Sequence, residues 1–91
     1  MINGNPKEFL ETLYNGEDTY FMFNKITYFA QGYSLNEAWH YEIVQENPTS
    51  DLVLWEYNGN IENVIASFEN AEIFDGKKFW EAEKDIEWTD I

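Results

Sequence analysis

Aromatic side chains set the strongest limit on the fold, because a chain of 91 residues has little else with which to build a core. A domain of this size buries only roughly 60–65% of the surface that its unfolded chain exposes. Seven Phe, six Tyr and four Trp residues compensate, since each buried aromatic side chain removes about 150–250 Å² from water. The sequence therefore predicts one folded domain over residues 1–91 and argues against a disordered chain.

Helical periodicity and turn signals divide the chain into seven elements. Asn5 as N-cap and Pro6 at the first helical position predict a helix over residues 6–14, which Asn15-Gly16 ends. Four aromatic or alternating segments predict strands over residues 19–24, 26–33, 38–46 and 52–57. Apolar residues at helical spacing predict two more helices, over residues 61–70 and 77–87. We expect a tight turn at Asn24-Lys25 and a loop over residues 34–37.

The order α-β-β-β-β-α-α predicts an α+β fold. It is an antiparallel meander of three to four strands, with one N-terminal and two C-terminal helices packed on one face. Because side chains alternate along a strand, both faces of the first two strands are apolar, and three short helices do not cover both. We expect an exposed aromatic face near Tyr20, Tyr28 and Tyr33. It is a docking or homodimer face, or a surface where tyrosine rings lie flat with wet hydroxyls.

Charge restricts the partners of this chain more than any motif does. The net charge is −13, Arg is absent, and Lys is absent between Lys25 and Lys77. Residues 42–91 hold thirteen acids and three Lys, for −10, which predicts an anionic C-terminal half. Such a chain repels nucleic acid and anionic membranes and attracts basic protein surfaces.

Hydropathy predicts a cytoplasmic protein. The longest apolar run is only four residues, Leu52–Trp55, whereas a membrane-spanning helix needs about 20. Residues 1–5 have neither the basic nor the apolar segment of a signal peptide.

Catalysis, cofactor binding and metal binding are not expected. The chain has no Cys and one His, His40, which shares a strand face with Glu42. An exposed strand histidine is the simplest interpretation, with pH sensing as the alternative. Carboxylates four residues apart crowd the last predicted helix, at positions 81/85 and 83/87. A solvated helix face explains them, since no loop has the pattern of a calcium site.

Two acidic segments, Glu62–Asn70 and Phe79–Asp85, follow the predicted strands. In these segments, in length and in the order of its elements, the chain resembles the small acidic anti-CRISPR inhibitors carried by phages of Gram-positive bacteria. The resemblance implies a protein that blocks a nuclease channel. The central strands are more aromatic than that pattern and the loops differ.

Two hypotheses follow for function. The first is a non-enzymatic protein that docks on a basic protein surface, as a nucleic-acid mimic or inhibitor. The acids best placed for this are Glu69, Glu72, Asp75, Glu81, Glu83 and Asp85. The second is a small interaction, adaptor or immunity-type domain that uses its aromatic face, with acidity serving only solubility. Salt and reversal of residues 81, 83 and 85 to Lys should weaken only the first kind of binding.

Overall fold

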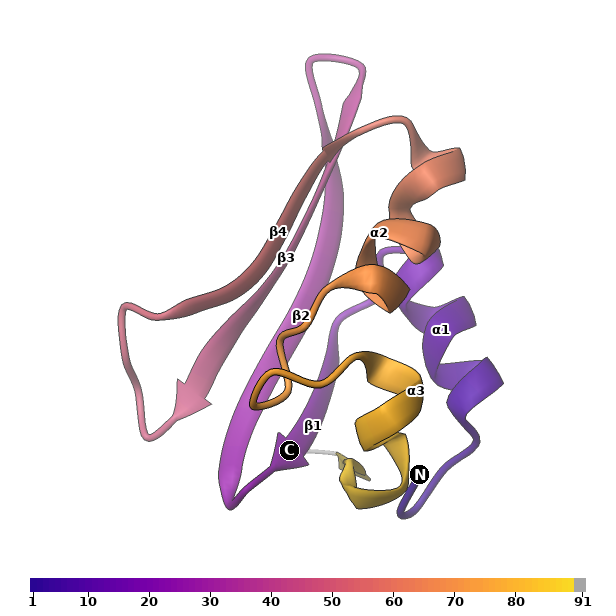
Figure 1. The fold of residues 1–91 in the computed structure, drawn as a ribbon. Coiled ribbons are helices and arrows are strands. Elements are labelled where there is room, and N and C mark those ends of the chain that lie inside the picture. The colour runs from indigo at the N-terminus through magenta and orange to yellow at the C-terminus, as the bar shows by residue number, and fades with distance from the viewer. Residues whose placement is uncertain (90–91) are drawn as a thin grey trace.

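A computed structural model describes residues 1–89 and confirms the α+β fold with a strand meander. The elements in chain order are α1 (Pro6–Tyr14), β1 (Thr19–Phe23), β2 (Ile26–Leu35), β3 (Ala38–Asn47), β4 (Val53–Gly59), the 3-10 helix η1 (Ile61–Asn63), α2 (Val64–Asn70), α3 (Phe79–Ala82), the 3-10 helix η2 (Glu83–Asp85) and β5 (Glu87–Thr89). The strands form one antiparallel sheet in the order β4-β3-β2-β1-β5. The helices α1, α2 and α3 lie on one side of it (Figure 1).

The first helix begins and ends where the sequence predicts. The side chain of Asn5 accepts a hydrogen bond from the backbone N–H of Lys7 at 2.8 Å, which caps the helix beside Pro6. Gly16 follows the helix with a φ of 72°, and its carbonyl accepts a hydrogen bond from the backbone N–H of Gly32 at 3.2 Å. A side chain at Gly32 would collide with the ring of Tyr41. These two glycines let the helix end lie directly against the sheet.

Two-residue turns join β1 to β2 and β2 to β3, and the second of these hairpins is longer than predicted. Asn24 and Lys25 both have left-handed backbone conformations, with φ values of 51° and 66°, and confirm the tight turn expected there. Asn36 and Glu37 form the same kind of turn between β2 and β3, so the loop predicted over residues 34–37 is present but shorter, because residues 34 and 35 belong to β2. The twist of such turns matches the twist of paired strands. Strand pairing therefore extends to the pair Leu35 and Ala38.

The predicted helix over residues 77–87 is wrong in length. Only α3 is α-helical, and the chain then passes through η2 into β5, which pairs with β1. Ile86 is fully buried, and the indole of Trp88 donates to Thr19 Oγ1 at 2.8 Å while packing edge-on against Phe9. Burial and strand pairing outweigh helix propensity here. The carboxylates at 81/85 and 83/87 therefore do not share a helix face.

The helix predicted over residues 61–70 is present, with a tighter first turn. Asn60 caps it by accepting a hydrogen bond from the backbone N–H of Glu62 at 2.9 Å, and η1 continues into α2. Within this segment, Val64 and Phe68 are buried.

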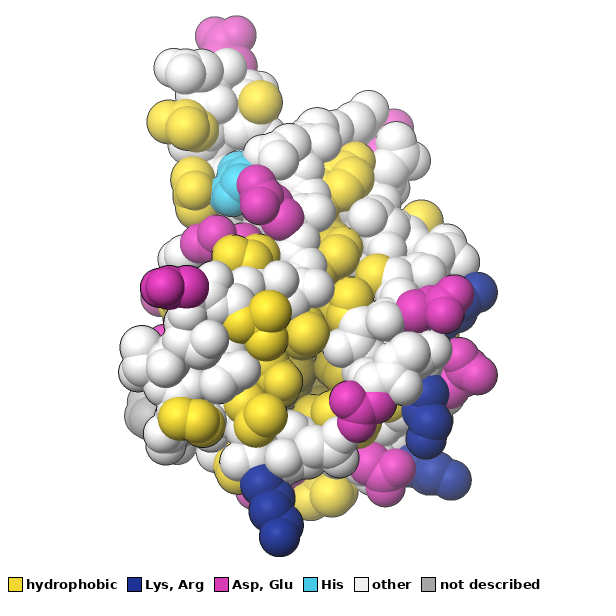
Figure 2. Space-filling view, turned by 60° about the vertical axis from the view of Figure 1, so that its left-hand side comes forward, with side chains coloured by type: hydrophobic (Ala, Val, Ile, Leu, Met, Phe, Trp, Pro, Cys, Tyr) yellow, Lys and Arg dark blue, Asp and Glu magenta, His cyan; other side chains and the backbone are white. Residues whose placement is uncertain are grey.

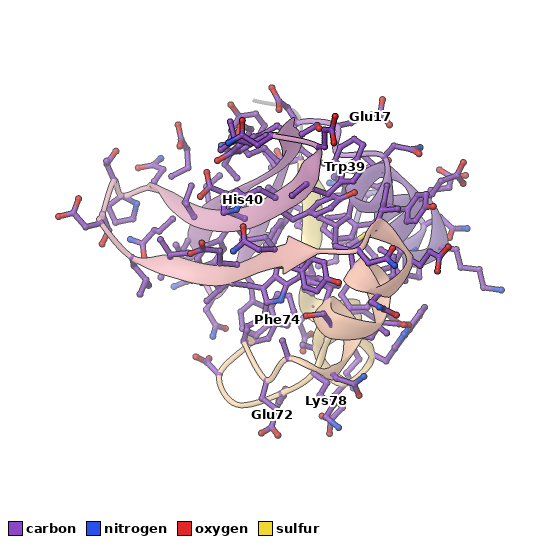
Figure 3. The ribbon with its side chains drawn as sticks, turned by 90° about the horizontal axis from the view of Figure 1, so that it is seen from above. Glu17, Trp39, His40, Glu72, Phe74 and Lys78 are labelled. Carbon is purple, nitrogen blue, oxygen red and sulfur yellow. The ribbon has the colours of Figure 1, made fainter. Side chains whose placement is uncertain are left out.

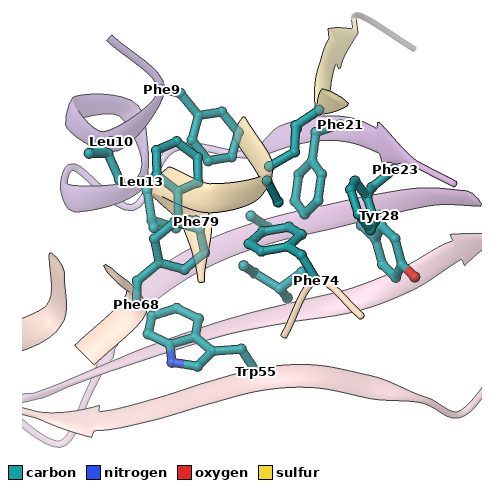
Figure 4. Close-up of a cluster of buried hydrophobic side chains, with 14 of the residues drawn as sticks. Phe9, Leu10, Leu13, Phe21, Phe23, Tyr28, Trp55, Phe68, Phe74 and Phe79 are labelled. Carbon is teal, nitrogen blue, oxygen red and sulfur yellow. The ribbon is translucent and has the colours of Figure 1, made fainter. Parts of the chain in front are cut away.

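Aromatic rings from the sheet and from all three α-helices form the core (Figure 4). Phe68 of α2 lies near its centre, with ring centroids 5.3 Å from Phe79, 5.4 Å from Trp55 and 6.1 Å from Phe74. The side of the sheet that packs on this core is called the helix face.

The opposite side of the sheet, called the open face, carries no helix from residues 1–89 (Figure 1), as the sequence predicts. The strand registers place the following side chains on it: Tyr20, Met22, Thr27, Phe29, Gln31, Tyr33, His40, Glu42, Val44, Val53, Glu56 and Asn58. Tyr20 and Phe29 are half-buried neighbours, with ring centroids 4.9 Å apart. Apolar side chains also reach the surface in the view of Figure 2, where they gather in its centre.

The two edges of the sheet differ. At the β5 edge, Ile2 donates its N–H to the carbonyl of Ile86 and accepts from the N–H of Trp88, both at 2.8 Å. The β4 edge has no such cover within residues 1–89. None of the helices in this part of the chain has the length and hydrophobicity needed to cross a bilayer.

Candidate docking face

Several C-terminal carboxylates that the sequence suggested for docking hold the fold together. Glu69 accepts a hydrogen bond from the indole of Trp80 at 2.6 Å, which ties α2 to α3. Glu81 accepts from the backbone N–H of Lys78 at 3.0 Å and so caps α3. Reversing either charge would change local structure as well as charge.

Two further acids of this group also have partners inside the protein. Glu83 forms an ion pair with the amino group of Met1 at 2.6 Å, and that amino group is buried. Asp75 accepts a hydrogen bond from the side chain of Asn24, which joins the loop before α3 to the β1–β2 turn. These carboxylates are therefore partly neutralised or engaged before any partner arrives.

The remaining two acids of the predicted set, Glu72 and Asp85, are exposed, and their side chains form no hydrogen bond or ion pair within residues 1–89. Lysines share this part of the molecule. Figure 3 places Glu72 and Lys78 on the same side, away from His40, and Lys84 directly precedes Asp85. The C-terminal part is thus a mixed surface rather than a uniformly anionic one.

The lysines are segregated in space. All five lie in the first turn of α1, at the β1–β2 turn, or in the segment that leads through α3 and η2; they are Lys7, Lys25, Lys77, Lys78 and Lys84. In Figure 2 the lysines occupy the lower part and the right-hand margin of the face, whereas its top carries carboxylates and the histidine. Residues 26–76, which include β2, β3 and β4, contain no Lys or Arg.

Two carboxylates lie opposite each other on the open face within this lysine-free region. Glu42 of β3 and Glu56 of β4 are directly paired in the strand register, and we call them the open-face pair. His40 Nε2 lies 3.8 Å from Glu42 Oε2 and 4.0 Å from Glu56 Oε1. Like charges directly opposite each other on adjacent strands destabilise a sheet. The side-chain amide of Asn58 donates to Glu56 at 3.4 Å and offsets part of this cost, but no lysine lies within residues 26–76 to neutralise the pair.

Polar neighbours orient the groups around the open-face pair. Gln31 donates to Glu42 at 2.7 Å from β2, and the amide oxygen of Asn58 contacts His40 Nδ1. The ring of Tyr33 lies 4.9 Å from the imidazole. The expectation that His40 and Glu42 share a face is confirmed, and the pH-sensing alternative stays a prediction.

The predicted tyrosine face is right for two residues and wrong for Tyr28. Tyr20 and Tyr33 lie on the open face, and Tyr33 is 41% exposed. Tyr28 pairs with Phe21 on the helix face, stacks on its ring at 5.4 Å and is only 7% exposed. Burial, with the nearby Asp75 carboxylate as a smaller cause, raises the pKa of Tyr28 above its ordinary value. Tyr28 is a core residue.

A shallow depression lies between the N-terminal segment, the β1–β2 turn and η2, and its lining is Ile2, Met22, Phe23, Asn24, Lys25, Asp85 and Glu87. The lining contains no His, Ser or Thr. Among residues 1–89, no three His, Asp or Glu side chains are grouped so as to hold a metal ion.

Comparison with known proteins gives no match: no protein-family model, no curated protein and no solved structure matches this chain. Function must therefore be argued from the side chains themselves. Sequence reasoning named Glu42 but not Glu56, although the turn between β3 and β4 brings them together. The signal that could have found Glu56 is its place in a strand that alternates beside the strand of Glu42.

Proposed function

We propose that this protein is a non-enzymatic binding protein that docks on a basic surface of a partner protein through the open face of its sheet. The observation that carries the proposal is the open-face pair, Glu42 and Glu56, in a region of 51 residues, 26–76, without Lys or Arg. A cation from a partner would relieve the repulsion between the two carboxylates. The repulsion that destabilises the free protein would then be replaced by attraction to the partner in the complex.

The overall charge supports the same proposal. A net charge of −13 steers a small protein toward positive surfaces and raises the rate of encounter. The face that carries the open-face pair also has partly exposed apolar side chains, namely Tyr20, Phe29 and Val44. An apolar centre with charged neighbours suits a protein interface, because burial supplies affinity and charge supplies orientation.

A homodimer through the open face is disfavoured by the same charges. A second copy on that face would bring two more carboxylates toward Glu42 and Glu56, with no lysine from residues 26–76 to compensate. Juxtaposed like charges cost several kcal/mol in an interface. The occupant we propose is therefore a different, basic protein.

The proposal extends to partners whose basic surface binds nucleic acid, in keeping with the resemblance to small acidic inhibitors. Docking there would exclude DNA or RNA, while the protein itself would be repelled by polyanions. We place this activity in the cytoplasm, which cell fractionation tests.

The apolar part of the open face supports a second candidate, an interaction domain that docks through Tyr20 and Phe29. These rings are half-buried, and their centroids lie 4.9 Å apart. In that case acidity contributes only solubility. Apolar contacts change little with ionic strength, so salt separates the two candidates.

Salt dependence of partner capture tests the proposed function. The purified protein is immobilised and exposed to a lysate of its source cells at about 0.05 M and about 0.5 M salt, which shortens the Debye length from roughly 14 Å to roughly 4 Å. We expect basic proteins to be retained at the lower salt concentration and released at the higher one. Heparin, a polyanion, should not bind to the immobilised protein. Retention that is unchanged by salt would contradict docking by charge and favour the apolar candidate.

A further inference from the structure

The edge of β4 is an open hydrogen-bonding edge. Within residues 1–89 the backbone of Val53–Gly59 pairs with β3 alone, and Figure 1 shows β4 as the outermost strand on its side of the sheet. Every second residue of an edge strand points its N–H and C=O groups away from the sheet. At the opposite edge, Ile2 already bonds to the backbone beside β5. Because only the β5 edge is covered, the β4 edge is able to accept another strand.

The β4 edge lacks two of the devices that keep strands apart. It contains neither Lys nor Pro. Leu52 is 50% exposed and Val53 is 45% exposed at its beginning. A register shift lies between Ile43 and Val44, but the five pairs from Trp39–Gly59 to Ile43–Trp55 are regular. The regular part of β4 is long enough to template a partner strand.

We propose that the β4 edge receives an extended basic segment of the partner protein as a sixth strand, an inference that rests on the proposed function. Charge identifies the occupant. Glu56 is the one charged residue of β4, Asp51 precedes the strand, and Glu62 follows it. No lysine or arginine from residues 26–76 opposes a basic chain that lies along this edge.

The alternation of β4 defines the pattern of that segment. Glu56 and Asn58 point to the open face, whereas Trp55 and Tyr57 point to the helix face. Alternate side chains of the added strand would therefore lie beside Glu56 and should be Arg or Lys. The side chains between them would lie on the helix side, near the partly buried Tyr57 and Ile61, and should be apolar.

A second copy of this chain fits the same edge poorly. In an antiparallel pairing of two β4 strands about their centres, Glu56 of one copy would approach Glu56 of the other. Each copy also carries a net charge of −13. Like charges oppose such a dimer.

Backbone methylation of a synthetic peptide tests the inference. The probe is a peptide of about nine residues, within the usual length of a strand, in which Arg and Val alternate. Two isomers carry N-methyl groups on alternate residues, one isomer blocking the first edge of the peptide and the other blocking the second. A peptide with Arg and Val in two separate blocks is the composition control. Affinity is measured by calorimetry, and amide exchange of Val53–Gly59 is followed by NMR.

We expect the alternating peptide to bind, one methylated isomer to lose at least tenfold in affinity, and the other to bind like the parent. Exchange of β4 amides should slow in the complex. If both isomers bind like the parent in a salt-dependent way, the edge inference is overturned and the proposed docking by charge survives. If no Arg peptide binds, both fail. Slow β4 exchange in a dimer formed without peptide would also overturn the inference.

Discussion

Replacing Phe68 with Ala is expected to lower the free energy of unfolding by about 3–5 kcal/mol. The ring of Phe68 is fully buried, and its centroid lies 5.3 to 6.3 Å from those of four other aromatic rings: Phe9, Trp55, Phe74 and Phe79. Alanine removes the apolar surface and leaves a cavity that rigid rings fill poorly. A domain of this kind has only about 5–15 kcal/mol in total. The variant should therefore lose a large share of the stability of the parent protein.

Urea unfolding followed by tryptophan fluorescence measures this effect, because Trp55 packs edge-on against Phe68. The matched control is Leu35→Ala at the β2–β3 hairpin, where the side chain is 59% exposed. We expect the control to change stability by less than about 0.5 kcal/mol, as surface substitutions usually do. A loss of under about 1 kcal/mol for Phe68→Ala would contradict the arrangement of the core around this ring.

Reversing both members of the open-face pair, Glu42→Lys with Glu56→Lys, is expected to reduce partner affinity by a factor of ten or more. Each lysine would face the cationic partner, and like-charge contacts in an interface cost several kcal/mol, where about 1.4 kcal/mol corresponds to tenfold. The fold should survive, because both side chains lie on the open face. Affinity is measured for a purified partner by calorimetry at about 0.1 M salt, where exposed charges still act over roughly 10 Å.

The control for overall charge is Glu11→Lys with Asp85→Lys. Both positions are exposed, and their side chains form no hydrogen bond or ion pair among residues 1–89. Each exchange replaces a negative charge with a positive one and raises the net charge by two, so both double variants change it from −13 to −9. The control should keep affinity within a few-fold of the parent. Equal losses in the two variants would show that net charge, rather than the open-face pair, drives binding.

Local signals predicted the N-terminal two thirds of the fold well. The cap at Asn5, the stop at Gly16 and the turn at Asn24-Lys25 act within a few residues, so the sequence reveals them directly. The two-residue turn also contains the information that Tyr28 is buried. With Phe23 opposite Ile26, Phe21 must lie opposite Tyr28 and share its face. Alternation within a single strand does not reveal this, so the predicted aromatic face wrongly includes Tyr28.

The C-terminal part could not be predicted from local pattern, because distant contacts decide it. The strand β5 depends on pairing with β1 and on the ring of Phe9, which lies some eighty residues away in sequence from Trp88. The roles of Glu69 and Glu83 depend on Trp80 and on the amino group of Met1. Some of the acidic residues that the sequence suggested for docking therefore form contacts that stabilise the fold. The lysine-free region is visible in the sequence, but the pairing of Glu42 with Glu56 depends on the register of the strands.

The most direct test of the account is a paired measurement on the single variant Glu56→Lys, which compares its unfolding free energy and its partner affinity with those of the parent protein. The account predicts opposite changes. Stability should rise by about 0.2–1 kcal/mol, because a lysine opposite Glu42 replaces a like-charge pair with an ion pair, while affinity should fall at least tenfold. An affinity equal to that of the parent in a variant that is folded and more stable would contradict the claim that the open-face pair binds the partner.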